Sequence, residues 1–358
     1  MSEEKNGTVN RAGWGCLGCG LGLLLGVVII ITVIVLGIIG LASLINDSDS
    51  PSSGIAQENT SKLEEEYIIG KSEDDQAKIA VVDIHGVIEF DDSPIPSDTA
   101  ADPRSVCARI RRAAEDKKVK ALIVNLNTPG GEVVASDEIY SEIRRFRQKT
   151  GKPAIALMRT MTASGGYYIA AACKPIIANK LTMTGSIGVI ISTYNYRGLF
   201  DKLGLQAEVY ASGKMKDMLN GARARTPEEV KVVQDMVNET YAEFVRIVSE
   251  SRKIPVERIR QSEIGDGRVF SGEQALKLGL VDSFGYFRDA VDAAAKASDL
   301  KQGKFAVIRY KESFSFGRFF SMLTSKSGLV PLNVSFNGTR SGTFTPKRGM
   351  LYYLPADF

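Results

Sequence analysis

The sequence predicts an α/β protein with a parallel-rich sheet, preceded by a membrane anchor. From Lys78 onwards, short runs of β-branched residues alternate with segments of helical periodicity, a pattern typical of parallel sheets. The chain has 358 residues, of which 44% are hydrophobic and 24% charged. This ordinary globular balance excludes a wholly disordered or fibrous chain. No charged residue occurs between Ala12 and Ile45, ahead of the α/β pattern.

The uncharged stretch predicts a transmembrane helix over residues 17–45. About 20 apolar residues span a hydrocarbon core, whereas the apolar part of a cleavable signal peptide is shorter, roughly 7–15 residues. Lys5 and Arg11 precede the stretch, and Asp47 and Asp49 follow it. The positive-inside rule then places residues 1–16 in the cytoplasm and the rest of the chain outside the cell membrane.

The remaining chain divides into a linker, a domain and a C-terminal extension. Residues 46–77 are rich in Ser, Asp, Glu and Gly and predict a solvated linker with a short helix over Leu63–Ile69. The domain is expected over residues 78–298 and the extension over residues 299–358. The strands expected in the domain are Ile79–Ile84, Ala121–Leu126, Ile155–Met158 and Ile176–Ala178, and the first helices are Arg104–Glu115, Val134–Lys149 and Gly165–Cys173.

Two later helices have recognisable starts. Thr226 is a preferred N-cap residue and is followed by a proline at the first position of a helix over Pro227–Arg252. Ser271 opens the sequence S-G-E-Q, a capping-box pattern, for a helix that ends at Gly279. A late strand is expected over Phe305–Tyr310.

Charge, histidine and cysteine contents exclude several classes of protein. The net charge of +3 is spread along the chain and does not indicate a nucleic-acid surface. The single histidine, His85, excludes a multi-histidine metal centre. The four cysteines are too few for a disulfide framework and lack the spacing of a zinc site. We therefore expect no histidine-rich metal centre and no zinc site.

Glycine-rich turns after predicted strands are the candidates for a catalytic site. Asn127-Thr-Pro-Gly-Gly131 follows the strand ALIVNL, and paired glycines permit peptide N–H groups to approach a developing oxyanion. When this motif is considered without the others, an ordinary turn between a strand and a helix explains it better than an oxyanion-binding turn. Thr162-Ala-Ser-Gly-Gly166 follows the strand AIALM and places Ser164 at a helix start, where a helix N-cap is the alternative interpretation. The third motif is Thr184-Gly-Ser-Ile-Gly188.

A serine nucleophile needs a base, and this chain offers His85 or a lysine. No sequence feature connects His85 to Ser164, so a histidine at a strand end is the better interpretation. Lysine can accept a proton from serine only where burial or neighbouring charges lower its pKa. Lys216 follows the strand-like run AEVYAS and lies among Met215, Met218 and Leu219, which predicts partial desolvation. An exposed surface lysine is the alternative.

Together these motifs resemble the signal peptide peptidase A family, which comprises membrane-anchored serine proteases with a Ser–Lys dyad. The matching stretches are NTPGGEV, MTASGGYYIAAAC, PIIANKLTMTGSIGVI and ASGKMKD, in the family's order, and the resemblance covers roughly residues 78–295. It implies a crotonase-like (Clp-protease-like) spiral fold in the short form, with one anchor and one catalytic domain.

The resemblance also implies a role for each matching residue. Ser164 corresponds to the nucleophile, Lys216 to the general base, and Ser186 to the hydroxyl that orients the lysine. The N–H groups of Gly131 and Gly165 correspond to the two oxyanion donors. Lys214 occupies the variable position two residues before the base. Thr128 stands where many relatives have serine, and the chain after about residue 300 has no counterpart.

The function implied is that of a membrane-anchored serine endopeptidase that degrades remnant signal peptides and other hydrophobic peptides. By the same resemblance we expect a homo-oligomer and a mechanism that needs no metal or organic cofactor, while the charge distribution leads us to expect no nucleic-acid partner. Two alternatives remain. A crotonase-type acyl-CoA enzyme also uses glycine N–H groups but needs neither an anchor nor a Ser–Lys pair. An inactive membrane scaffold would keep the fold and lose the dyad, whereas both dyad residues are present here.

Overall fold

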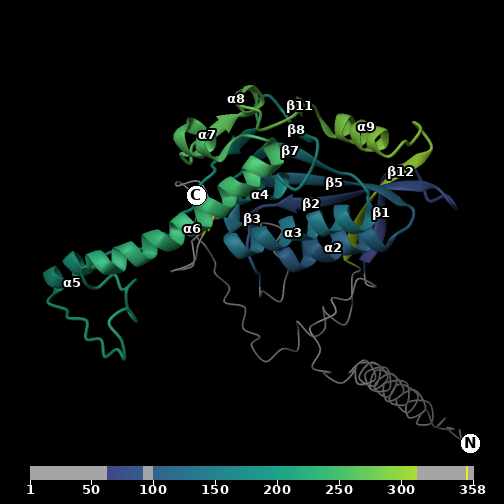
Figure 1. The fold of residues 1–358 in the computed structure, drawn as a ribbon. Coiled ribbons are helices and arrows are strands. Elements are labelled where there is room, and N and C mark those ends of the chain that lie inside the picture. Colours follow the sequence, from purple (N-terminus) through teal and green to yellow (C-terminus); the bar gives the residue numbers. More distant parts are fainter. Residues whose placement is uncertain (1–62, 92–99, 313–351, 354–358) are drawn as a thin grey trace, which may run out of the picture. The chain divides into compact units, whose positions relative to one another are not determined.

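The computed structural model describes residues 63–91, 100–312 and 352–353, which belong to one compact unit. Within them, a nine-stranded sheet has the order β1-β12-β2-β5-β7-β8-β11, with β9 beside β7 and β10 beside β9 (Figure 1). The predicted α/β class with a parallel-rich sheet is confirmed. The strands of this sheet are β1 (Leu63–Ile69), β2 (Ala77–His85), β5 (Val119–Thr128), β7 (Ala154–Ala163), β8 (Ile176–Ala178), β9 (Met183–Gly185), β10 (Val269–Ser271), β11 (Ser283–Phe284) and β12 (Phe305–Glu312).

The central strands are parallel and are buried on both faces. Strand β5 pairs in parallel with β2 and β7, and β12 pairs in parallel with β2. Alternate residues of each strand point to opposite faces, so Val82 and Val124 enter one core while Val81 and Ile123 enter the other. Burial on both sides explains why these strands read as continuous apolar runs in the sequence.

Helices cover both faces of this sheet. Helices α2 and α3 pack side by side on one face, and α9 lies on the other (Figure 1). The helices of the described residues are α2 (Pro103–Glu115), α3 (Val133–Thr150), α4 (Gly165–Ala170), α5 (Arg197–Leu203), α6 (Pro227–Arg252), α7 (Val256–Gln261), α8 (Gly272–Lys277) and α9 (Phe287–Ala297), with a 3-10 turn at Glu263–Gly265. The two predicted starts are confirmed, since Thr226 and Ser271 each form a complete capping box.

A second, smaller sheet lies beside the predicted catalytic turns. Its order is β13-β6-β3-β4, in which β6 is Gly131–Glu132 and β3 is Val87–Ile88. Strand β4 is Ala100–Ala101. Strand β13 is Tyr352–Tyr353 and pairs antiparallel with β6, so part of the C-terminal extension adds a strand to the edge that contains Gly131.

Three sequence-based expectations differ from the structure. Leu63–Ile69 is strand β1 rather than a short helix, because it pairs antiparallel with β12. The run AEVYAS before Lys216 is not a strand; its residues 207–212 are exposed and have no partner strand. The main sheet also includes two strands, β1 and β12, that lie outside the range 78–298 expected for the domain.

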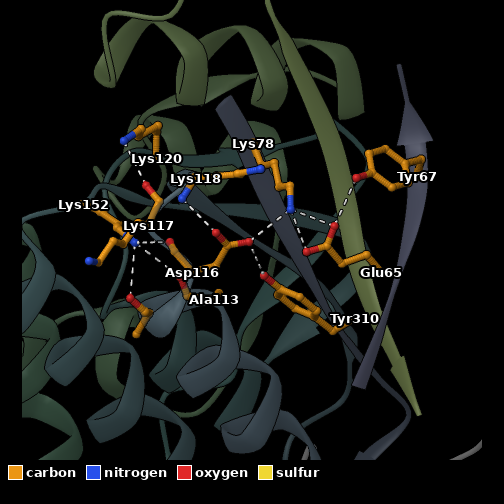
Figure 2. Close-up of polar contacts among 11 residues, drawn as sticks. Glu65, Tyr67, Lys78, Ala113, Asp116, Lys117, Lys118, Lys120, Lys152 and Tyr310 are labelled. Atoms are coloured by element: carbon orange, nitrogen blue, oxygen red, sulfur yellow. Dashed lines mark hydrogen bonds and ion pairs between the residues drawn. The ribbon is translucent and has the colours of Figure 1, made fainter. Parts of the chain in front are cut away.

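An ion cluster fastens the sheet edge to the end of α2 (Figure 2). Lys78 of β2 donates to Glu65 of β1 at 2.7 Å and to Asp116, at the C-cap of α2, at 3.2 Å. Tyr310 of β12 donates to the same Asp116 carboxylate at 3.5 Å. Burial alone would raise the pKa of Asp116, but hydrogen bonds from Lys118 N–H and Lys78 outweigh it and hold this pKa below its usual value. The cluster therefore joins β1, β2, β12 and the C-terminal end of α2.

The predicted transmembrane helix over residues 17–45 lies outside the described residues, as do residues 1–16. Among the residues that are described, no helix is both long enough and apolar enough to cross a membrane.

Candidate active site

The register of three adjacent strands brings the glycine-rich motifs together. Thr128 at the end of β5 is paired with Thr162 of β7. Ala163, the last residue of β7, is paired with Gly185, the last residue of β9. Because these strands are parallel, their carboxyl ends meet at one edge of the sheet. The residues that follow them are Pro129-Gly130-Gly131, Ser164 and Ser186, so these three segments lie side by side.

Ser164 has a strained backbone and an unpartnered hydroxyl. Its φ of 55° and ψ of −116° form a combination that residues with a side chain rarely adopt. The residue is fully buried, its N–H donates to Gly185 O at 2.8 Å, and its Oγ has no hydrogen-bond partner within the described part of the chain. Ser164 occupies the N-cap position of α4, as the alternative interpretation has it, but its side chain makes no capping hydrogen bond. A buried unsatisfied hydroxyl at a strained position is typical of a functional residue.

Gly131 and Gly165 approach each other too closely for side chains. A Cβ atom on Gly165 would lie 2.5 Å from Ser136 Oγ and 3.2 Å from Gly131 N. A Cβ atom on Gly131 would lie 1.9 Å from Ile88 O. The predicted pair of oxyanion donors is therefore adjacent in space, and glycine is required at both positions by the backbone and side-chain atoms around them.

Ser186 lies at the same edge as Ser164. It is buried, has a φ of 50°, and follows Gly185, whose φ is 83°. The N–H of Ser186 donates to Arg268 O at 2.8 Å, which fixes this turn against the segment before β10. The structure thus brings Ser164, Ser186, Gly131 and Gly165 together.

Lys216 is not part of this group within one chain. It lies in the turn before α6, and its neighbour Asp217 is bound to Arg223, which also binds Glu229 in the first turn of α6. At the other end of this helix Phe244 contacts Tyr168, and the Tyr168 N–H donates to Ser164 O. Phe244 lies fifteen residues beyond Glu229, about 22 Å along an α-helix. That separation is too great for the four-carbon stem of a lysine.

The surroundings of Lys216 are exposed, which differs from the partial desolvation that the sequence suggested. Its side chain is exposed and makes no hydrogen bond or ion pair within the described residues, whereas Lys214 pairs with Glu228 at 2.9 Å. Figure 1 shows α5 and its neighbouring segments at the end of α6 away from α4. Several large apolar side chains are exposed on these segments and on the first turns of α6, namely Tyr194, Leu199, Leu203, Leu205, Val209, Tyr210, Val230 and Met236.

His85 does not contact Ser164. It ends β2, two strands from β7, and strands in a sheet lie about 4.8 Å apart. Its closest charged neighbour is Asp83, with the Nε2 and Oδ1 atoms 3.9 Å apart. The interpretation of His85 as a residue at a strand end is confirmed.

Two kinds of supporting residue were not found from the sequence. Thr184 donates to Thr162 O at 2.7 Å, and Thr162 donates to Leu126 O at 3.0 Å, so threonine hydroxyls cross-link the ends of β9, β7 and β5. Ser136, fully buried on α3, donates to Glu132 O at 2.9 Å beside Gly165. Threonines are common in strands, and only the three-dimensional register distinguishes these two.

The described residues show no metal-binding cluster of His, Cys, Asp or Glu side chains. At the edge that holds Ser164, the chemistry comes from the Ser164 hydroxyl and the two glycine amides. A hydroxyl beside paired N–H donors is an arrangement suited to acyl transfer.

Comparison with known proteins agrees with this chemistry. The family model described as peptidase family S49 matches residues 146–301, a range that contains Ser164, Ser186 and Lys216. A putative signal peptide peptidase SppA of Enterococcus faecium is 37% identical over 235 residues, which are 65% of this chain and 67% of that protein.

Two other relatives carry protease names. A putative protease of Synechocystis is 38% identical over 227 residues, covering 63% of this chain and 76% of that protein. A chloroplastic serine protease SPPA of Arabidopsis thaliana is 34% identical over 230 residues, which are 63% of this chain but 33% of the plant protein. The residues matched by the family model include the ends of β7 and β9, and the chain belongs to peptidase family S49, the signal peptide peptidase A family.

Proposed function

We propose that this peptidase is a membrane-anchored serine endopeptidase with a Ser–Lys dyad, in which Ser164 is the nucleophile and Lys216 the general base. The observation that carries the proposal is the environment of Ser164. Its backbone is strained, and its buried hydroxyl lies beside Gly131 and Gly165 with no hydrogen-bond partner among the described residues. The arrangement is consistent with the crotonase-like spiral fold that the sequence motifs imply.

The reaction is acyl transfer to water. Ser164 Oγ attacks the peptide carbonyl carbon while neutral Lys216 accepts the hydroxyl proton. The N–H groups of Gly131 and Gly165 stabilise the oxyanion, and the lysine then gives its proton to the leaving amine. In the second half, the lysine takes a proton from a water that attacks the acyl-enzyme. It returns this proton to Ser164 Oγ as the bond between Oγ and the acyl carbon breaks and the peptide acid leaves. Ser186 orients the lysine amine. No metal or organic cofactor takes part.

The base is supplied by a second copy of the chain. Lys216 is separated from Ser164 by most of the length of α6, and the segments around it expose a group of large apolar side chains. A homo-oligomer in which these segments pack against the Ser164 edge of a neighbour would bury the apolar group. It would also place Lys216 beside Ser164 and Ser186 and desolvate the amine, as the reaction requires.

The substrates are extended hydrophobic peptides, including remnant signal peptides. Strand β6 contains Gly131 and accepts β13 as an antiparallel neighbour, so this edge can add an extended segment as a strand. A substrate strand in that position would bring its carbonyl group to the Gly131 amide. An N-terminal anchor over residues 17–45 would hold the domain at the outer surface of the cell membrane, where such peptides remain.

A fluorophosphonate probe tests the nucleophile directly. The wild-type protein should become labelled at Ser164, and Ser164→Ala should lose both labelling and cleavage of a hydrophobic peptide. Because Ser164 Oγ makes no hydrogen bond, the substitution should leave the melting temperature within a few degrees of wild type. A folded Ser164→Ala variant that still cleaves the peptide would contradict the proposal. An acyl-CoA enzyme or an inactive scaffold would leave Ser164 unlabelled.

A further inference from the structure

The turn that carries Lys216 is held by one arginine. Arg223 donates to Asp217 through Nε at 2.9 Å and through a terminal nitrogen at 2.7 Å, and it also donates to Asp217 O at 3.3 Å. Asp217 is the residue directly after Lys216. A planar guanidinium that binds both oxygens of one carboxylate fixes position as well as charge.

The same arginine connects this turn to the start of α6. Arg223 donates to both carboxylate oxygens of Glu229, in one case at 3.0 Å. Glu229 is 2% exposed and also accepts the Thr226 N–H in the capping box. The Lys216 turn is therefore bound to the capped first turn of a 26-residue helix.

Arg223 also compensates the acidic groups closest to Lys216. Its hydrogen bonds lower the pKa of Asp217 to about 2 and that of Glu229 to about 2, so both carboxylates are charged but are bound to the guanidinium. The other charged groups around the turn are Lys214 and Glu228, which pair with each other, and Arg225, which binds Thr193. Lys216 is thus left without a carboxylate partner among the described residues.

We propose that Arg223 is a positioning residue for Lys216, which fixes the lysine turn through Asp217 and Glu229 and keeps both carboxylates from pairing with the lysine amine. The inference rests on the proposed Ser–Lys function. The inference does not depend on whether Lys216 acts on Ser164 of its own chain or of a neighbouring copy, because Arg223 binds the residue next to Lys216 in the same chain. A base that must be neutral to accept a proton works poorly beside an unpaired carboxylate, which favours the ammonium form.

The test compares Arg223→Gln with Arg246→Gln in the full-length protein. Arg246 also binds two carboxylates, those of Glu243 and Glu250, but it lies on the later part of α6 and makes a matched control. For Arg223→Gln we expect kcat for a hydrophobic peptide to fall about tenfold or more, with KM little changed, because the base is misplaced while the substrate strand is not. The acidic limb of its pH–rate profile should move to higher pH, whereas Arg246→Gln should keep the wild-type kcat and profile.

Two further variants make the result decisive. Arg223→Lys keeps the charge and should restore the pH profile but only part of kcat, since an ammonium cannot bind both carboxylates in the same geometry. Asp217→Asn leaves the Arg223–Glu229 pair in place, so it provides a second test of the positioning role if Arg223→Gln does not fold. It should lower kcat about threefold without moving the acidic limb upward.

Wild-type kcat and an unchanged pH profile in folded Arg223→Gln, or wild-type kcat in Asp217→Asn, would overturn the inference. Lys216→Arg measured alongside separates this from the proposed function. An inactive Lys216→Arg with a fully active Arg223→Gln overturns only the positioning role, whereas an active Lys216→Arg overturns both.

Discussion

The N–H of Ser164 donates a 2.8 Å hydrogen bond to the carbonyl of Gly185, the residue that precedes Ser186. This bond continues the pairing of β7 with β9 by one residue beyond the last strand residue of β7. It ties the strained backbone of Ser164 to a turn with two consecutive positive φ values. The pairing of β7 with β9 therefore fixes the positions of both serines of the candidate site. Substitutions at the ends of these strands should lower the catalytic rate more than the stability of the fold.

Gly131→Ala should inactivate the enzyme. Its Cβ atom would lie 1.9 Å from Ile88 O, so β6 must shift away from β3 and carry the Gly131 amide with it. Loss of one oxyanion donor typically lowers the rate about 100-fold or more. The measurement is kcat for a hydrophobic peptide, with circular dichroism to establish folding.

Gly151→Ala is the control for that substitution, because no atom lies within 4 Å of the added Cβ and the residue is the C-cap of α3, at the opposite end of that helix from Gly131. Its φ of 68° makes alanine costly there, so the variant should lose some stability and keep the wild-type kcat. Full activity in a folded Gly131→Ala protein would exclude this amide as an oxyanion donor.

The strands that matter most for the site were predictable from the sequence, and the distance between the dyad residues was not. Apolar runs such as ALIVNL identify buried strands followed by glycine-rich turns, and the resemblance of these turns to a known family implied that Ser164 and Gly131 share one site. The position of Lys216 depends on the direction in which α6 leaves the domain, which no local pattern encodes. Leu63–Ile69 was misassigned because its pairing partner, β12, is more than 200 residues away in sequence.

Replacement of the base should distinguish Lys216 from its neighbours. Lys216→Arg should be nearly inactive, because arginine keeps the charge but does not deprotonate in a protein. Lys214→Arg should keep most of its rate, since an arginine can maintain the exposed pair with Glu228. His85→Gln should do the same, as His85 does not contact Ser164. If His85→Gln abolished activity in a folded protein, a histidine base would replace the dyad.

Removal of the C-terminal extension should increase activity toward added peptides. Tyr352–Tyr353 occupies the edge of β6 that a substrate strand would use, and a tethered competitor acts at a high effective concentration. A protein truncated before Ser341 should show a lower KM, by roughly threefold or more. If this strand is also cleaved, wild type and Ser164→Ala should differ in the mass of the intact chain. An unchanged KM would mean that the pairing with β6 does not compete with substrate.

Asp116→Asn should lower the free energy of unfolding at pH 7 by about 1–3 kcal/mol, because it leaves Lys78 with one carboxylate instead of two in a mostly buried position. The folded pKa of Asp116 is lowered, so its stabilising effect is present above the unfolded value and is lost as the pH falls through the folded value. The difference from wild type should therefore begin to shrink below about pH 4, where an unfolded aspartate takes up its proton, and disappear only below the lower folded pKa. Urea unfolding at several pH values measures it.

Asp235→Asn is the control for this prediction, since its pair with Lys231 is exposed on α6 and contributes little. If both variants lost the same free energy of unfolding at pH 7, the cluster of Figure 2 would be no more stabilising than a surface ion pair.

The most direct test of the Ser–Lys mechanism is the peptidase activity of a mixture of two inactive variants, Ser164→Ala and Lys216→Ala. Each supplies what the other lacks if the serine of one copy uses the lysine of another. After the subunits have been dissociated and reassembled together in equal amounts, we predict recovery of about one quarter of the wild-type rate, because that fraction of random neighbours combines an intact serine with an intact lysine. A mixture that forms mixed oligomers yet remains inactive would contradict the account.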